Sequence, residues 1–184
     1  MSETATKKKE AGMAQLVIVL FAISAITALL LGLVNMVTAP AIAANEKAKK
    51  DAAMAAVLPY DGEYIQVEYT GEDKSIASMY QAGDNGYVVE VNCSGSFSGT
   101  LSIMAGVDAN GVCTGVEIIK TAETSGLGAN AGKETFKDQF KGKTGTIQVA
   151  KDGGEINALT GATITSRAVS AGVTSAIAAA QSMG

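Results

Sequence analysis

The C-terminal part of the chain contains the sequence Asn157-Ala158-Leu159-Thr160-Gly161-Ala162-Thr163-Ile164-Thr165-Ser166-Arg167. It combines three threonines and one serine within seven residues with a Gly-Ala pair and the only arginine of the protein, Arg167. Directly after it, Val169, Val173 and Ile177 recur every four residues among Ala, Ser and Gly, which predicts a helix with one apolar stripe. Hydroxyls at a helix start lie where backbone amides can receive an anion. The stretch therefore predicts an attachment point for a phosphate-bearing cofactor.

The composition of the 184-residue chain limits the chemistry that it can perform. There is no histidine, which excludes imidazole acid–base catalysis, histidine-dependent nucleophiles and histidine-ligated metals. Two cysteines, Cys93 and Cys113, are too few for an iron–sulfur cluster; they either pair in an oxidising compartment or lie buried as small apolar residues. The net charge of −4 and the scattered basic residues exclude a nucleic-acid partner. We therefore expect no catalytic residue and no metal site, and chemistry that comes from a bound organic cofactor.

An uncharged apolar segment lies near the N-terminus. Residues 13–38 are long enough for a transmembrane helix, since about 20 apolar residues span a bilayer. The alternative is a cleaved signal peptide, because Ala41-Ile42-Ala43 resembles a cleavage site, but the apolar region of such a peptide has only about 7–15 residues. Lysines flank the segment on both sides, so charge alone does not orient it. The short basic tail, residues 1–12, favours a single-pass anchor in the lipid of the cell (inner) membrane, with a cytoplasmic N-terminus and an extracytoplasmic domain.

The rest of the chain changes its periodicity at Pro59. Residues 39–58, rich in Ala, Lys and Glu, predict a helical stalk. Beyond it, Asn110-Gly111 predicts a hairpin turn, and the phenylalanines of residues 134–141 predict a short amphipathic helix. Alternating and β-branched runs predict strands over residues 65–69, 76–81, 86–91, 100–107, 112–120 and 146–149. The expected fold class is α+β, in which a single N-terminal transmembrane helix precedes an antiparallel sheet with packed helices in residues 59–184.

Three motifs in the second half of the chain resemble those of a known family. Residues 95–99 (Gly-Ser-Phe-Ser-Gly) resemble its Gly-Phe-Gly-Gly loop, and residues 123–128 (Glu-Thr-Ser-Gly-Leu-Gly) resemble its Glu-Thr-Pro-Gly-Leu-Gly loop. Residues 160–163 (Thr-Gly-Ala-Thr) resemble its flavinylation signal, Asp-x-x-Ser/Thr-Gly-Ala-Thr. With the tail, the span and the stalk, the chain resembles the FMN-binding G subunits of the Rnf complex over essentially its whole length. It is also similar to the C subunits of the sodium-pumping NADH:quinone reductase, but its shorter length favours the Rnf family.

The resemblance implies that FMN is joined through its phosphate to the hydroxyl of Thr163. Nothing in a histidine-free chain activates that hydroxyl, so the family's separate flavin transferase, ApbE, which uses FAD and magnesium, is an expected partner. Taken alone, Thr163 would be interpreted as a helix-capping threonine. We expect Thr165, Ser166 and the helix amides to bind the phosphate, with Arg167 adding charge. The other expected cofactor contacts are Thr160, Gly161 and Ala162 in the signal, and Glu123, Thr124, Gly126, Leu127 and Gly128 in the loop bordering the isoalloxazine.

The motifs also depart from the family pattern at three positions. Ser125 replaces the proline of the loop, Thr121 replaces a histidine that many members have, and Asn157 replaces the aspartate that begins the signal. None of these changes removes the acceptor hydroxyl of Thr163.

The function that the resemblance implies is electron transfer within a membrane complex. The protein would relay electrons between redox centres of a ferredoxin:NAD+ oxidoreductase whose electron flow is coupled to movement of Na+ or H+, and it would not be catalytic alone. Its implied partners are the other Rnf subunits, RnfA, RnfB, RnfC, RnfD and RnfE. The alternatives are the C-type quinone-reductase subunit, a free-standing extracytoplasmic flavoprotein and, from another class, a non-redox membrane-anchored surface module.

Overall fold

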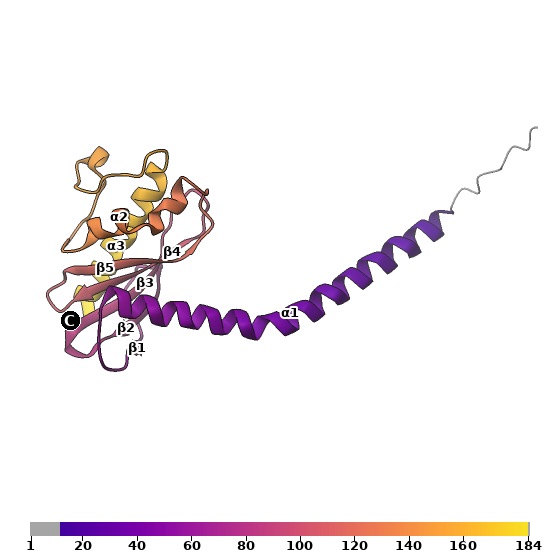
Figure 1. Ribbon diagram of the computed structural model, residues 1–184, viewed down its shortest axis with the longest axis horizontal. Coiled ribbons are helices and arrows are strands. Elements are labelled where there is room, and N and C mark those ends of the chain that lie inside the picture. Colours follow the sequence, from indigo (N-terminus) through magenta and orange to yellow (C-terminus); the bar gives the residue numbers. More distant parts are fainter. Residues whose placement is uncertain (1–11, 184) are drawn as a thin grey trace, which may run out of the picture. The chain divides into compact units, whose positions relative to one another are not determined.

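The computed structural model describes residues 12–183, so the basic tail expected over residues 1–12 lies outside the described residues except for Gly12. The chain forms two compact units that meet between Lys47 and Ala48. A single helix, α1 (Met13–Val57), begins in the first unit and ends in the second (Figure 1).

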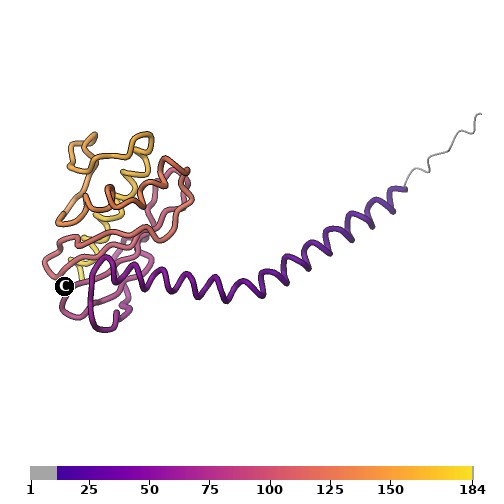
Figure 2. The backbone as a smooth tube through the Cα atoms, in the orientation of Figure 1, coloured from indigo at the N-terminus to yellow at the C-terminus, as the bar shows by residue number. Residues whose placement is uncertain are grey.

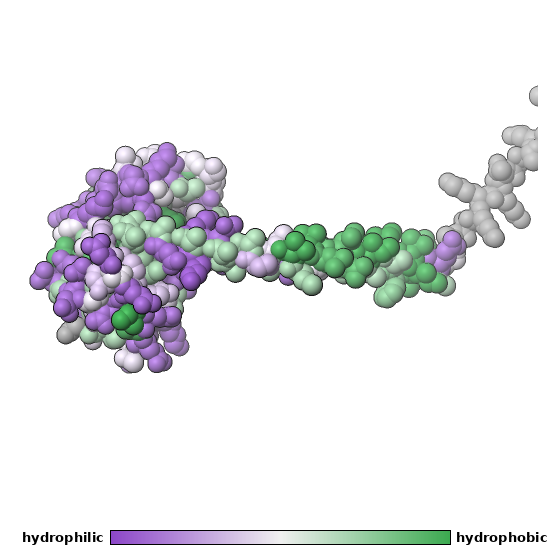
Figure 3. Space-filling model, turned by 60° about the horizontal axis from the view of Figure 1, so that its bottom comes forward, coloured by the Kyte–Doolittle hydropathy of each residue, from purple (hydrophilic) through white to green (hydrophobic). Residues whose placement is uncertain are grey.

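The first unit is the apolar part of α1. Its large apolar side chains are exposed, and they form the continuous hydrophobic surface seen in Figure 3. Within residues 12–183, α1 is the one helix long and apolar enough to cross a membrane. The helix continues through Pro40, although a proline ring removes one backbone N–H donor. No break in the helix marks the expected boundary between span and stalk.

The second unit, whose backbone is traced in Figure 2, is built on an antiparallel sheet. The strands lie in the sheet in the same order as in the chain. The strands are β1 (Ile65–Val67), β2 (Ile76–Gln81), β3 (Gly86–Asn92), β4 (Leu101–Asp108) and β5 (Cys113–Thr121). A 3-10 turn, η1 (Gly83–Asn85), connects β2 to β3. The α+β class and these five strands are confirmed.

The hairpin between β4 and β5 is the one that Asn110-Gly111 predicts. The Asp108 carboxylate accepts hydrogen bonds from the amides of Asn110 (2.8 Å) and Val112 (2.9 Å). Gly111 has a φ of +75°, a conformation that glycine adopts without strain. The turn therefore forms from local chemistry that the sequence displays.

Helices cover both faces of the sheet. On one face lies α3 (Thr163–Met183), whose predicted stripe of Val169, Val173 and Ile177 is at most 1% exposed. On the other face, Met54 and Val57 from the end of α1 pack in a smaller core with sheet residues such as Val88 and Met104. The central strands are thus buried on both sides, which explains their nearly continuous apolar sequences.

Short helical turns and loops connect β5 to α3. They are η2 (Gly128–Gly132), α2 (Glu134–Lys137), η3 (Asp138–Phe140) and η4 (Ala150–Asp152). The helix predicted over residues 134–141 is present as α2 and η3. The rings of Phe136 and Phe140 pack edge to face, with their centroids 5.4 Å apart. The strand predicted over residues 146–149 is wrong. Only Val149 forms an isolated bridge, to Ile156, and the amide of Ile147 donates instead to the hydroxyl of Thr174 on α3 (2.9 Å).

The two cysteines are free and buried. The amide of Cys93 donates to the Leu101 carbonyl at one end of β4, whereas Cys113 pairs with Val107 at the other end. Six residues of strand separate these positions by about 20 Å, so a disulfide between them is excluded. Burial raises the pKa of Cys93 to about 12 and that of Cys113 to about 11, as expected for packed, unreactive thiols.

Candidate functional site

The candidate site is built around the first turn of α3. The chain turns at Gly161, which has a φ of +75°, and the helix begins at Thr163. The carbonyl of Ala162 accepts the amide of Ser166 (3.0 Å), so Ala162 supplies the first helical acceptor. By helix geometry, the amides of residues 163–165 have no acceptor within the helix, and the positive end of the helix dipole lies here. Thr163 is half-buried, which leaves its hydroxyl accessible at this end.

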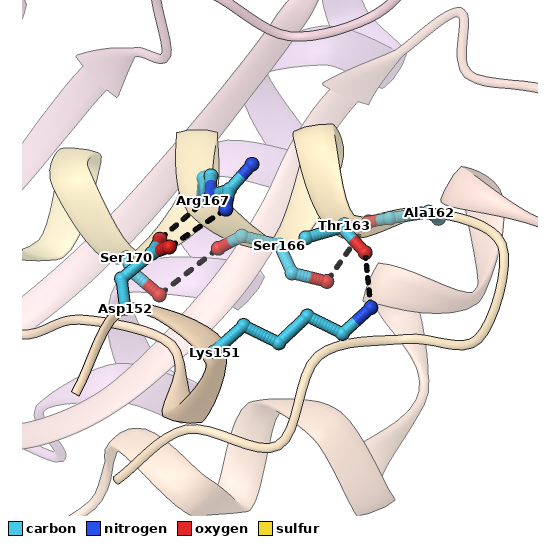
Figure 4. A network of polar contacts seen from close by, with 7 residues as sticks. All are labelled: Lys151, Asp152, Ala162, Thr163, Ser166, Arg167 and Ser170. Carbon is cyan, nitrogen blue, oxygen red and sulfur yellow. Dashed lines mark hydrogen bonds and ion pairs between the residues drawn. The ribbon is translucent and has the colours of Figure 1, made fainter. Parts of the chain in front are cut away.

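Lys151, which lies outside all three sequence motifs, contacts Thr163. The Lys151 ammonium donates a hydrogen bond to Thr163 Oγ1 at 3.3 Å (Figure 4). Lys151 belongs to η4 and is separated from Thr163 by the eleven residues 152–162, which contain Gly153 and Gly154. The two residues come together only because this loop folds back on the helix, so no sequence motif predicts their contact.

The structure gives Arg167 and Ser166 partners within the protein. The guanidinium of Arg167 makes two hydrogen bonds of 2.6 Å to the Asp152 carboxylate, and this contact lowers the pKa of Asp152. The Ser166 hydroxyl donates to the Ala162 carbonyl and accepts the amide of Leu159, both at 2.9 Å. These side chains organise the turn and the helix around Thr163 (Figure 4).

Glu123 connects the three sequence motifs. It is 8% exposed. One carboxylate oxygen accepts the amide (3.0 Å) and the hydroxyl (2.9 Å) of Ser98, from the first motif. The other oxygen accepts the hydroxyl of Thr165 (2.7 Å), two residues beyond Thr163. Segments 25 and 42 residues away from Glu123 are therefore held by one side chain.

The hydrogen bonds keep Glu123 ionised in spite of its burial. Burial raises the pKa of its carboxyl, but the donors from Ser98, Thr165 and the Phe97 amide together hold the pKa below the usual value of 4.5. The hydroxyl of Thr121, where many family members have a histidine, accepts the amide of Glu123 at 3.1 Å. Thr121 thus supports the backbone at the start of this loop.

Glycines allow the loop of residues 123–128 to lie directly against the start of α3. A methyl group on Gly128 would overlap the Glu123 carboxylate and lie 2.7 Å from Thr165 Oγ1. A methyl group on Gly161 would lie 3.0 Å from the side chain of Leu127. The loop itself is closed by the Thr124 carbonyl, which accepts the amide of Leu127 (3.1 Å). The structure therefore brings the predicted loop and the predicted signal into contact.

One large apolar side chain is exposed in each of the first two motifs, and another is exposed directly after the third motif. Phe97 is 70% exposed, Leu127 44% and Ile164 50%. In the second unit, the only other large apolar residue exposed among the described residues is Ile65, on β1. The first motif also contains Ser96, which is buried and whose hydroxyl has no hydrogen-bond partner among the described residues. Apolar side chains around a fixed carboxylate, with an unpaired hydroxyl and free helix amides nearby, fit a ligand that has both an apolar ring and a phosphate.

No group of histidine, cysteine or acidic side chains suited to a metal ion occurs among residues 12–183.

Comparison with known proteins leads to the same ligand. Residues 96–178 match the family model described as the FMN-binding domain. The matched range contains Glu123, Lys151 and Thr163. This part of the chain therefore resembles FMN-binding domains, and it is preceded by one helix suited to a membrane.

The sequences of curated relatives define the family. The G subunit of the Na(+)-translocating ferredoxin:NAD(+) oxidoreductase complex of Acetobacterium woodii is 37% identical over 182 residues, which cover 87% of each chain. The G subunit of the ion-translocating oxidoreductase complex of Methanosarcina acetivorans is 30% identical over 84% of this chain and 87% of that protein. The chain belongs to the family of G subunits of ion-translocating oxidoreductase complexes.

Among solved structures, the C subunit of the Na(+)-translocating NADH-quinone reductase of Parabacteroides distasonis is similar at a TM-score of 0.48 and 20% identity. The match covers 72% of this chain and 80% of that one.

Proposed function

We propose that the protein is the electron-transferring flavoprotein subunit of a membrane-bound, ion-translocating ferredoxin:NAD+ oxidoreductase, and that it carries FMN through a phosphoester to Thr163. The family membership and the FMN-binding domain support the flavoprotein role. The observation that carries the site assignment is the junction at Glu123, where three motifs distant in sequence meet beside the first residue of α3.

The start of α3 suits the phosphate of the cofactor. The free amides of residues 163–165 and the helix dipole favour a negative group at this position. Thr163 is the first helical residue, and its β-branched side chain has few rotamers, so its hydroxyl stays near those amides. The hydroxyl of Thr165 faces Glu123 and that of Ser166 faces Ala162, so the backbone is a better source of donors than these two side chains.

The exposed apolar side chains suit the ring of the cofactor. Covering Phe97, Leu127 and Ile164 removes apolar surface from water, which contributes about 25 cal/mol for each Å² covered. Ser96 and the loop amides supply hydrogen-bonding groups for the polar edge of an isoalloxazine. When bound, FMN supplies the electron-transfer chemistry, and the residues of this chain hold and orient it.

The proposed setting is a membrane complex. Helix α1 anchors the protein, residues 59–184 face the extracytoplasmic side, and the other Rnf subunits supply the ferredoxin, NAD and ion sites. A separate flavin transferase attaches the cofactor, because no side chain near Thr163 is a base able to remove its proton at neutral pH.

The test is co-expression of the full-length chain with a flavin transferase, followed by a denaturing gel viewed under ultraviolet light. We expect a fluorescent band for the wild type and none for Thr163→Val. The control is Thr144→Val, which removes an exposed threonine hydroxyl outside the three motifs and should leave the band intact. A dark wild-type band, or a bright Thr163→Val band, contradicts the proposal.

A further inference from the structure

We infer that Lys151 is the side chain that binds the phosphate at Thr163 and prepares the Thr163 hydroxyl for its modification. The inference rests on the proposed attachment of FMN at Thr163. Its starting observation is the hydrogen bond of 3.3 Å from the Lys151 ammonium to Thr163 Oγ1. A cation at this distance from the acceptor oxygen is also within reach of any phosphate joined to that oxygen.

Lys151 is the available cation at this site, because Arg167, the other basic residue of the network in Figure 4, is paired. The guanidinium of Arg167 is held by the Asp152 carboxylate. No carboxylate of the described residues forms an ion pair with Lys151. Its charge therefore remains available for the single negative charge of a phosphodiester.

The Asp152–Arg167 pair holds Lys151 in place. Arg167 lies one helical turn beyond Thr163, so its contact with Asp152 fastens η4 to the helix that carries the acceptor (Figure 4). The amide of Asp152 also donates to the Val149 carbonyl (2.8 Å), and Val149 bridges to Ile156. Arg167 is thus a positioning residue that acts through Asp152, rather than a ligand of the phosphate.

The transfer that Lys151 assists is a phosphoryl substitution with FAD as the donor. The oxygen of Thr163 forms a bond to the phosphorus of the FMN half, and the bond from that phosphorus to the bridging oxygen breaks. AMP leaves with the bridging oxygen, and the threonine proton is released to solvent. Because Lys151 donates its hydrogen bond, it uses one lone pair of the hydroxyl oxygen and leaves the other free for attack. Its charge also stabilises the negative charge that develops on the oxygen and on the phosphate.

The experiment measures the rate at which purified full-length protein, expressed without transferase, gains FMN mass when it is mixed with transferase, FAD and Mg²⁺. We expect Lys151→Met to react about ten-fold more slowly or worse, since a charge-assisted hydrogen bond is lost. Lys151→Arg should recover most of the rate, because it keeps the charge. The matched control is Lys74→Met, which removes an exposed lysine far from the site. The residue before it, Asp73, is hydrogen-bonded to Ser175. Ser175 lies about 18 Å along α3 from Thr163.

A second comparison tests the positioning role. In Arg167→Met the Asp152 carboxylate loses its partner and can pair with Lys151, so the reaction should slow. In the double variant Asp152→Asn/Arg167→Met that competing charge is absent, and the rate should rise above that of Arg167→Met. Thermal unfolding of each variant shows whether the domain is intact.

The outcomes separate the two claims. If the wild type is modified at Thr163 and Lys151→Met gains FMN mass at the same rate, the role of Lys151 is overturned and the attachment site stands. A folded Lys151→Met that is slow and is not recovered by Lys151→Arg also overturns it, because the charge is then not the cause. A wild type that gains no FMN mass overturns the attachment and this inference together.

Discussion

At the scale of single residues, Glu123 determines how the site is assembled. Its carboxylate accepts hydrogen bonds from Ser98, in the first motif, and from Thr165, two residues beyond the third motif. The sequence, through its resemblance to a family, pointed to Glu123 and to Thr163 as cofactor residues. It could not show that the carboxylate joins the motifs, nor that Lys151 lies at Thr163, because such contacts arise only when distant segments fold together.

Replacing Glu123 tests this junction. In Glu123→Gln one carboxylate oxygen becomes an NH₂ group. This hydrogen-bond donor then faces another donor, from either Ser98 or Thr165, and one hydrogen bond is lost. We expect a loss of about 1–3 kcal/mol in the free energy of unfolding, measured by urea denaturation of the full-length protein in detergent. The control is Glu63→Gln, an exposed glutamate outside the site. Equal stabilities of the two variants would show that the junction is not stabilising.

The same carboxylate predicts a pH dependence. The folded-state pKa of Glu123 lies below 4.5, so its contribution to stability is complete above about pH 4.5 and is lost as the pH falls through the folded-state pKa. The difference in unfolding free energy between the wild type and Glu123→Gln should therefore be constant from pH 6 to 7 and shrink below about pH 4.5. A difference that grows on acidification contradicts the assignment of a depressed pKa.

At the scale of elements, the local sequence pattern predicted the five strands and α3. It failed where the backbone hydrogen-bonds to a residue distant in sequence and does not pair with a neighbouring strand. Residues 146–149 alternate like a strand, and Ile147 and Val149 are indeed buried. Their backbone partners, however, are the Thr174 hydroxyl and a single bridge at Ile156, which the alternation does not reveal. The Asn110-Gly111 turn, in contrast, depends on neighbouring residues alone and was predictable.

The end of α1 lies against two sheet glycines, and this contact is testable. Gly106 and Gly115 pair across β4 and β5, and a methyl group on Gly106 would overlap the Val57 carbonyl oxygen. The hydroxyl of Thr114 donates to that same carbonyl. We expect Gly106→Ala to lower the unfolding free energy by about 1–3 kcal/mol through overpacking. Gly132→Ala, at a glycine with open space around it, is the control, and equal thermal midpoints would contradict the contact.

At the scale of the whole molecule, one helix serves both units of the chain. The sequence suggested a stalk over residues 39–58 that precedes a domain beginning at residue 59. The structure places Ala53, Met54, Val57 and Leu58 in the smaller core of the domain, and Lys50 donates to the Glu90 carboxylate at 2.8 Å. The composition that suggested a stalk did not reveal this packing, because alanine and lysine suit both an exposed helix and a docked one.

Two truncations test where the domain begins. A fragment of residues 48–184 should be soluble and unfold cooperatively. A fragment of residues 59–184 lacks the apolar side chains at the end of α1. Burial of each large one stabilises the fold by about 1.5–3 kcal/mol, so this fragment should be markedly less stable or aggregate. Circular dichroism melting compares the two, and matching melting curves would show that residues 48–58 are a dispensable stalk.

The central claim is that Thr163 carries FMN, and a tryptic peptide tests it most directly. Cleavage after Lys151 and Arg167 releases residues 152–167, which contain every hydroxyl of the proposed signal. Fragmentation of this peptide in a mass spectrometer then assigns any added mass to one side chain. The account predicts the mass of one FMN less one water on Thr163, with Thr160, Thr165 and Ser166 unmodified. An unmodified peptide from protein matured with the transferase, or the added mass on one of the other hydroxyls, would contradict it.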